Sequence, residues 1–565
     1  MRLAIATVLL TELAALGCAG GTRRFPLRDP LWQDDDERPF AGPPSEYWSP
    51  LAWDAADKTI FLPVSEALSM RPGGEAWNVN ALDEVPDSSW FHARAGRRPL
   101  SREDLAQGAC KGRAPLSTDS EWVVVSAKPN GANPGFVIEA ADGRKFLVKF
   151  EVDQAERATA GDAIGSRVYW AAGFETPCNT VVFMKPDVLR IAPDAKIEEG
   201  GEKVKLERRH LDPIFEAAPK APDGTFRASA SLFFDAKPLG PWTYEGRRDD
   251  DPNDVVPHDD RREVRAGYVL GAWLNHFDAR EQNTMALWIE PGEKGRGFVR
   301  HAMLDWGDCF GSIWEWDALT RRLGHSHYLD FQHVAEDFVT LGLLRRPWHD
   351  VKLGPSGRVL GYFDADHFTP DAWRPGYPNP AFGRMTERDA AWMARIIAKI
   401  DEAAVDAMID EAKVRSPVTD GELRRILKAR RAKILQRWLG RLSPLTSPEI
   451  SAAEKGALCM EDLVVTTGLS APKTRGYSAR GFVGDSLSET AVAAPTISGD
   501  GRVCAAAPRA AGASKASPKY VIVDLFATSP GFGRKAPARV HLYDLGDALR
   551  IVGLERPGDD APPRP

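Results

Sequence analysis

The stretch 271–311 places the tightest constraint on what this chain can fold into. His276 is followed two residues later by Asp278, and Asn283 comes five residues after Asp278. Asp305 stands in an Asp-Trp-Gly turn that follows an apolar segment. Carboxylate and amide oxygens are the ligands that hard divalent cations prefer in proteins. These three side chains are therefore our first candidates for a functional site.

Regular elements are expected around the candidates. Arg262–Leu274 has the apolar spacing of an amphipathic helix. Thr284–Ile289 and 297–304 have the composition of two strands, joined by a turn rich in glycine and charge. A helix, an acidic loop, a strand pair and an acidic turn, in this order, form the layout of a phosphoryl-transfer site.

The motifs resemble those of protein kinases. His276-Phe-Asp278-x-x-x-x-Asn283 is similar to the catalytic loop H-R-D-x-x-x-x-N, and Asp305-Trp-Gly is similar to D-F-G. The resemblance implies that Asp278 orients or deprotonates the acceptor hydroxyl and that Asn283 and Asp305 hold Mg²⁺ or Mn²⁺ on the phosphates of ATP or another nucleotide. Phe277 replaces the motif's arginine, so regulation through a phosphorylated activation loop is not expected.

A predicted hairpin and a predicted helix precede these kinase-like motifs in the chain. Segments 136–139 and 145–151 flank Asp142-Gly143, which is a strong hairpin signal, and Lys149 lies in the second strand. A helix is expected over 156–172. The resemblance implies that Lys149 grips phosphate oxygens and is oriented by an acid of this helix. We favour Asp162 over Glu156 because Asp162 lies on the more central turn.

A loop rich in turn formers, 128–135, comes just before this hairpin. Gly131 and Gly135 would let backbone N–H groups approach phosphates closely. A plain surface turn is the alternative interpretation of the same residues. The loop is weak evidence by itself and gains weight from the lysine strand and acidic helix behind it.

The resemblance covers about 120–440 and is nearest in style to the HipA-type kinases, the phosphoinositide kinases and the secretory-pathway kinases. It implies an α+β fold with a bilobal kinase-like domain. A β-rich small lobe would span about 119–235 and a helical large lobe about 236–442, with all four key side chains converging on one cleft. The alternative is that Asp278, Asn283 and Asp305 are turn and cap residues of an unrelated α+β protein.

Three segments within this domain carry many charges. Residues 185–225 have the composition of an insertion. Segment 247–262 holds six Asp among Arg and Pro, and we interpret it as a solvated loop whose Asp259 and Asp260 cap the following helix. The helix expected over 421–439 is basic, and we interpret its cations as an exposed face: Arg424, Arg425, Arg430, Arg431 and Lys433.

The remaining parts of the chain are assigned by composition. Residues 1–18 resemble a bacterial lipoprotein signal, with a basic start, an apolar segment and small residues before Cys18. Lipid on Cys18 would anchor the chain in the cell envelope, and Ala19 favours the outer membrane. An ordinary secretory peptide is the alternative. A Pro- and Trp-rich tether and lead-in is expected over 19–118, and a small β-rich domain over 449–556.

The number of cysteines and the net charge bear on disulfide formation and on the class of binding partner. An exported chain can form disulfides, and five cysteines remain after Cys18. We expect Cys459 and Cys504 to pair, whereas nothing selects a pair among Cys110, Cys178 and Cys309. The net charge of -7 argues against nucleic acid as the main partner.

Two functions are compatible with these features. The first is a metal- and nucleotide-dependent phosphotransferase of unknown acceptor. The second is a non-catalytic envelope lipoprotein that keeps the fold as a binding scaffold, because nucleoside triphosphates are scarce outside the cytoplasm. Retention of all the polar site groups favours the first.

Overall fold

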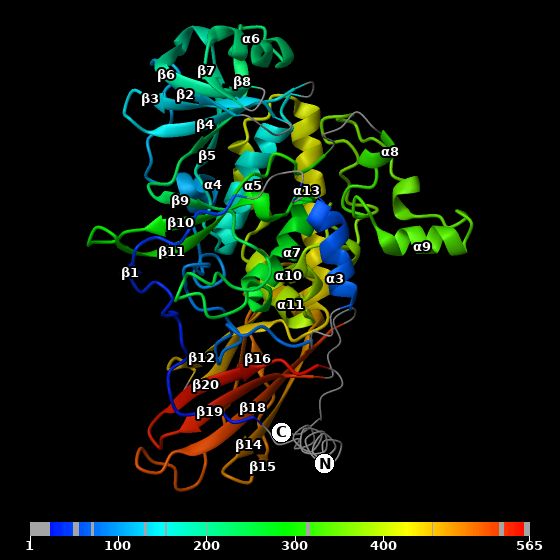
Figure 1. The fold of residues 1–565 in the computed structure, drawn as a ribbon. Helices are drawn as coiled ribbons and strands as arrows, with labels where there is room; N and C mark the ends of the chain where they lie inside the picture. Colours follow the sequence, from blue (N-terminus) through cyan, green and yellow to red (C-terminus); the bar gives the residue numbers. More distant parts are fainter. Residues whose placement is uncertain are drawn as a thin grey trace, which may run out of the picture. The chain divides into compact units, whose positions relative to one another are not determined.

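The computed structural model describes residues 23–48, 53, 56–68, 73–128, 133–152, 155–199, 202–311, 317–454, 456–529 and 536–558. The fold mixes helices and several sheets, as expected (Figure 1). The chain divides into two compact units. The larger comprises 31–80 and 84–441, and the smaller comprises 1–30, 81–83 and 442–565. Cys18 and Gly131 lie outside the described residues, so the predictions made for them stay predictions.

A seven-stranded sheet forms the first layer of the larger unit. Its order is β5-β8-β4-β3-β2-β6-β7. The strands are β2 (Trp122–Ala127), β3 (Gly135–Ala140), β4 (Lys145–Phe150), β5 (Asn179–Met184), β6 (Leu189–Glu199), β7 (Glu202–Lys205) and β8 (Phe226–Leu232). Helix α6 (Arg208–Ala217) buries Leu211 and Ile214 in the apolar core of the sheet. Segment 185–225 supplies the strands β6 and β7 at one edge of the sheet and the helix α6 that enters its core, and its assignment as an insertion stays a prediction.

Alternation along β4 decides which side chains face which layer. Phe146, Val148 and Phe150 enter the core that α6 covers. Lys149 points to the opposite face, as successive residues of a strand must. Helix α5 (Ala158–Ala172) contacts β5 and β8. The lysine thus extends toward α5.

A second sheet, β1-β11-β10-β9, carries the predicted strand pair. Its strands are β1 (Phe40–Ala41), β9 (Lys237–Gly240), β10 (Thr284–Ile289) and β11 (Arg296–Met303). Helix α7 spans Arg262–Leu274, the predicted bounds, and β10 also has its predicted bounds. The second strand is shifted by one residue from its predicted limits.

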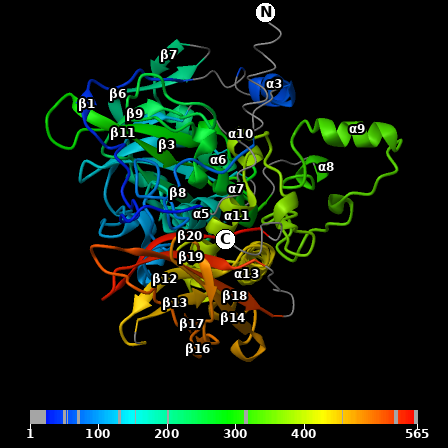
Figure 2. The same cartoon turned by 90° about the horizontal axis from the view of Figure 1, so that it is seen from below.

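Helices dominate the rest of the larger unit. They are α3 (Leu62–Leu68), α4 (Arg102–Gln107), α8 (Asp317–Thr320), α9 (Phe331–Val339), α10 (Pro380–Gly383), α11 (Glu387–Ala398), α12 (Glu402–Asp410) and α13 (Pro417–Leu439). Short π or 3-10 turns lie at Asp57–Phe61, Gly108–Cys110, Pro186–Val188, His258–Asp260, Glu281–Asn283, Pro347–His349 and Pro370–Ala372. Figure 2 shows α8 and α9 to one side of α7 and α11.

Two expectations about charged segments are wrong. Asp259 and Asp260 do not cap α7, whose N-cap residue Arg261 makes no side-chain cap hydrogen bond. Both aspartates are buried, and Arg384 lies 2.6 Å from Asp260. The basic face of α13 is not simply exposed either, because Arg430 is only 4 % exposed. Each buried charge has polar partners that the local sequence does not reveal.

The smaller unit stacks two antiparallel sheets, β12-β13-β17-β16 and β15-β14-β18-β19-β20, around one apolar core. Its elements are β12 (Leu445–Ser451), β13 (Ala457–Asp462), α14 (Leu463–Thr466), a 3-10 turn (Pro472–Thr474), β14 (Gly476–Val483), β15 (Ser488–Thr490), β16 (Thr496–Ile497), β17 (Arg502–Ala505), β18 (Lys519–Thr528), β19 (Ala538–Asp544) and β20 (Leu549–Glu555). Phe25, expected in a loose tether, is buried in this unit, and its N–H donates to the Tyr520 hydroxyl at 2.9 Å.

Cysteines 459 and 504 form the predicted disulfide. They face each other across β13 and β17, with their Cα atoms 4.1 Å apart. Among the residues described, none of the helices is both long and apolar enough to cross a bilayer.

Replacing both Cys459 and Cys504 by serine is expected to destabilise the smaller unit by roughly 2–4 kcal/mol, because the unfolded segment gains conformational freedom. Urea unfolding monitored by circular dichroism measures this change. The parent protein under reducing conditions should match the double variant for this transition. Equal stability of the oxidised parent and the double variant would contradict the expectation.

Candidate functional site

Lys149 is held between two carboxylates. Its Nζ lies 2.8 Å from Asp162 Oδ2 and 2.8 Å from Asp305 Oδ1. The lysine comes from β4, Asp162 from α5, and Asp305 from the turn after β11. Asp162 also accepts a hydrogen bond from the Ser229 hydroxyl at 2.8 Å, and Ser229 is the β8 residue opposite Lys149. The sequence-based preference for Asp162 over Glu156 agrees with this geometry.

Two glycines of α5 let the Asp-Trp-Gly turn reach Asp162. A Cβ on Gly161 would lie 2.4 Å from the carbonyl oxygen of Trp306, and one on Gly165 would lie 2.3 Å from the indole. The backbone N–H of Trp306 donates to Asp162 Oδ1 at 3.1 Å. The indole ring of Trp306 is fully buried. Close packing of helix and turn therefore sets the distance between Asp162 and Asp305.

Charges in this cluster alter one another's ionisation. Burial alone would raise the pKa of Asp305, but Lys149 and Lys128 lower it well below its usual range. Burial opposes the charge on Lys149, yet Asp162 and Asp305 raise its pKa. Asp305 and Lys149 are therefore both charged at neutral pH. The Asp305 side chain is 39 % exposed, so a ligand can reach it.

The predicted catalytic loop lies beside this cluster. Asn275, the C-cap residue of helix α7, adopts the left-handed conformation and turns the chain toward Asp278. Asn283 Nδ2 donates to Asp278 Oδ2 at 2.9 Å and to its backbone carbonyl at 2.7 Å. Arg280 Nε lies 3.0 Å from Asp278 Oδ1. Because the side-chain amide nitrogen of Asn283 donates to Asp278, its side-chain oxygen Oδ1 points its lone pairs elsewhere and can accept from or coordinate a ligand.

His276 has a structural place in this loop. It is fully buried, and burial lowers its pKa to about 4, so the ring is neutral. Its Nδ1 lies 3.2 Å from the Tyr169 hydroxyl of α5. The residue therefore links the loop to the helix that carries Asp162.

Asp308 is a site residue that the motif comparison missed. It shares a hydrogen bond with Asp278, and burial, followed by repulsion from Asp278 and Asp305, raises its pKa well above the usual value. Burial, opposed by Arg280 and Asn283, also raises the pKa of Asp278. The only sequence signal was an acid one residue after the Asp-Trp-Gly turn.

Lys128 is a second missed residue. Its Nζ donates to the carbonyl of Asn133 at 3.2 Å, and burial lowers its pKa while Asp305 opposes that effect. Gly135, predicted to approach phosphate, pairs with Lys149 across β3 and β4. A Cβ there would lie 2.2 Å from the Val148 carbonyl oxygen, so strand packing alone requires glycine. Its phosphate contact stays a prediction.

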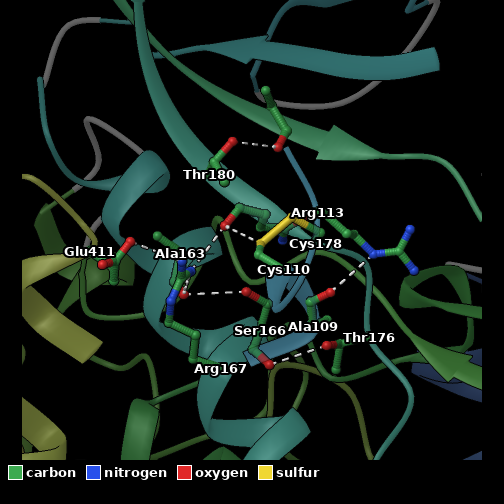
Figure 3. The surroundings of a disulfide bond; sticks show 12 residues. Ala109, Cys110, Arg113, Ala163, Ser166, Arg167, Thr176, Cys178, Thr180 and Glu411 are labelled. Carbon is green, nitrogen blue, oxygen red and sulfur yellow. Dashed lines mark hydrogen bonds and ion pairs between the residues drawn. A yellow bond between two sulfur atoms is a disulfide. The ribbon is translucent and has the colours of Figure 1, made fainter. Parts of the chain in front are cut away.

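A disulfide braces the helix that carries Asp162. Cys110 pairs with Cys178, just before β5 (Figure 3). Arg167 of α5 donates to the carbonyl of Ala163 in the same helix at 2.8 Å and to that of Asn179, the residue after Cys178, at 2.9 Å. The covalent link therefore fixes the segment against which α5 packs. Cys309, the remaining cysteine described, is buried and free.

The side chains offer hard oxygen donors. Asp278, Asn283, Asp305 and Asp308 are the types that bind Mg²⁺ or Mn²⁺. In the described part of the chain, no three His, Cys, Asp or Glu side chains are arranged to hold a metal ion by themselves. Phosphate and water oxygens would have to complete the coordination, as is usual for Mg²⁺ at nucleotide sites.

Comparisons with known proteins give only remote likenesses. No family model and no curated protein matches the chain. A Helicobacter pylori proinflammatory kinase, CtkA, is 11 % identical over 57 % of this chain and 98 % of its own, with a TM-score of 0.28. The Golgi casein kinase is 11 % identical over 53 % and 77 %, at 0.24. Its structure with Mn/ADP bound is 12 % identical over 54 % and 83 %, at 0.22. Likenesses with such low TM-scores do not indicate a function for this chain.

Replacing Asp308 by asparagine is expected to raise the stability of the ligand-free protein at neutral pH. Asparagine keeps a donor for Asp278 but removes a carboxyl that is repelled by Asp278 and Asp305. The gain is expected because burial and the two neighbouring carboxylates disfavour the charged form of Asp308 in the folded protein, and asparagine carries no such charge. Thermal unfolding at pH 7 measures it, and an unchanged or lower midpoint would contradict the expectation.

Proposed function

We propose that the larger unit is a kinase-like domain of two lobes that binds a nucleotide with Mg²⁺ or Mn²⁺ and transfers a phosphoryl group. The observation that carries the proposal is Lys149 held at 2.8 Å from both Asp162 and Asp305, with Asp278 and Asn283 beside them. These residues come from a sheet, a helix and two loops that span more than 150 positions. Phosphoryl transfer needs such convergence, because positioning and charge neutralisation must act at one point.

Each side chain has a chemical task under this proposal. Lys149, kept charged by Asp162, binds phosphate oxygens. Asp305 and Asn283 hold the metal, which neutralises charge on the phosphates. Asp278 accepts the proton of the acceptor hydroxyl or orients that hydroxyl. The raised pKa of Asp278 brings its proton affinity closer to that of a general base.

The acceptor is left open by this chemistry, and so is the choice between phosphoryl and nucleotidyl transfer. A non-catalytic scaffold with the same fold remains the alternative. The predicted membrane anchor at Cys18, and the outer-membrane location that it implies, remain part of the proposal as predictions.

Nucleotide binding is the first test. ADP with Mn²⁺ should raise the unfolding midpoint of the full chain by mass action. Lys149→Ala should reduce the shift and Asp305→Ala should abolish its metal dependence. Lys145→Ala is the matched control, because Lys145 lies on the same strand with a side chain that is 52 % exposed. No shift for the parent protein, or equal shifts for all variants, would support the scaffold.

Transfer is tested separately from binding. Asp278→Asn should keep most of the nucleotide-induced shift, because Asp278 faces the acceptor. It should lower transfer of label from γ-labelled ATP to water or protein by about 10²-fold or more. Phosphate release and protein labelling are the measurements. Loss of nucleotide binding in this variant would show that Asp278 acts on the nucleotide, contrary to its assigned role.

A further inference from the structure

A pocket lies in the larger unit, bounded by the 323–325, 344–348 and 362–374 segments and by α13. Its volume is about 440 Å³, within the usual range for small-molecule sites. Trp348, Trp373 and Phe368 supply aromatic walls, and Arg430 and His325 supply polar groups. None of the residues assigned to phosphoryl transfer lines it. The pocket is therefore separate from the proposed phosphoryl-transfer site.

Arg430 is the unusual member of this lining. Its guanidinium stacks 3.7 Å from the ring centroid of Phe368 and 4.6 Å from that of Phe363. It donates to the carbonyls of Asp364 at 2.9 Å and Ala272 at 2.5 Å. Its Nε is buried without a hydrogen-bond partner in the residues described. Burial lowers its pKa to about 9, which still leaves a cation at neutral pH.

The acids that line the pocket are engaged elsewhere. Asp364 Oδ2 lies 2.5 Å from His367 Nδ1, and Asp371 Oδ2 accepts from Arg437 at 2.7 Å. Within the described ranges, Arg430 has no carboxylate at ion-pair distance. A buried cation without a counter-ion is costly, and an anionic ligand would remove that cost.

The other three arginines of the lining already have acidic partners. Arg345 pairs with Asp350, Arg346 with Glu336 and Asp337, and Arg374 with Asp330. Arg430 is thus the arginine of this described lining that has no carboxylate at ion-pair distance, and Asp364 acts on its charge only from farther away. The binding anion is therefore expected at Arg430 and not at the rim.

His325 adds a neutral polar group. Burial, reinforced by Arg430, lowers its pKa to about 4, so the ring is uncharged at neutral pH. Among the described residues, burial and nearby charges act on this ring, and no hydrogen bond does. One ring nitrogen can therefore donate to a ligand oxygen while the other accepts.

We propose that this pocket binds a small molecule that carries one oxyanion group, a carboxylate or a phosphate ester, on an aromatic or apolar body. The anion pairs with Arg430, and the body packs against the Trp348 and Trp373 walls. A polyanion is disfavoured because Asp364 and Asp371 also line the space. The proposal does not depend on the phosphotransferase function, because none of that site's residues takes part.

Calorimetry on the full chain tests the proposal with three probes of one shape. Phenylacetate and phenyl phosphate carry the oxyanion, and phenylacetamide is the neutral control. At least one anion should bind at least ten-fold more tightly than the amide. A preference for phenylacetate over phenyl phosphate identifies a carboxylate site, and the reverse identifies a phosphate-ester site. Equal binding of all three probes, or binding of none, overturns the proposal.

Variants locate the binding. Arg430→Gln should erase the preference for the anions over the amide. Because that change also affects two backbone contacts, Ala372→Trp provides a second test that fills the pocket from its exposed rim and leaves Arg430 in place. It should weaken anion binding ten-fold or more with an unchanged unfolding midpoint. Arg345→Gln, at a neutralised rim arginine, should bind like the parent. A folded Ala372→Trp variant with parental affinity places the binding elsewhere and overturns the proposal.

Discussion

The buried contact of Lys149 with Asp162 and Asp305 is the interaction on which the architecture of the larger unit depends. It joins β4 and the next element, α5, to the turn after β11, which lies more than a hundred residues further along the chain. Removing one partner of such a cluster leaves an uncompensated buried charge, at a cost of several kcal/mol. The same contact keeps a cation and a carboxylate ready for a charged ligand. Stability and the proposed chemistry therefore rest on the same atoms.

Close packing supports that contact from behind. Gly161 and Gly165 let the Asp-Trp-Gly turn approach α5 so closely that the backbone N–H of Trp306 donates to Asp162. His276 reaches the same helix through the Tyr169 hydroxyl. The Cys110–Cys178 bond braces the neighbouring segment. Helix α5 is thus the element that sets the relative positions of the lysine and the two acidic loops.

Buried arginines recur away from this site. Arg262 and Arg265 of α7 pair with Asp389 of α11, at 3.1 Å and 3.6 Å. These pairs satisfy the charges within the fold. Arg430 of α13 differs, because its guanidinium donates to backbone carbonyls and stacks on an aromatic ring, and no carboxylate of the described residues lies at ion-pair distance from it. That difference separates a structural ion pair from a candidate ligand site.

The sequence by itself determined the local elements and the spacing of the site residues. Apolar periodicity placed α7, and strand composition placed β10, at their observed bounds. The position of Cys459 and Cys504 in one small β-rich domain predicted their disulfide. Helical spacing singled out Asp162. These features depend on neighbouring residues, whose preferences a single sequence expresses directly.

The tertiary structure alone decided which charges are buried and what they touch. Asp308 became a site residue because the turn directs it at Asp278, and Lys128 because its strand ends near Asp305. Asp259 and Asp260, predicted to cap a helix, and Arg430, predicted to be exposed, are all buried. The ionisation and the pairing of a side chain depend on distances between residues remote in sequence. Those distances exist only once the layers have packed.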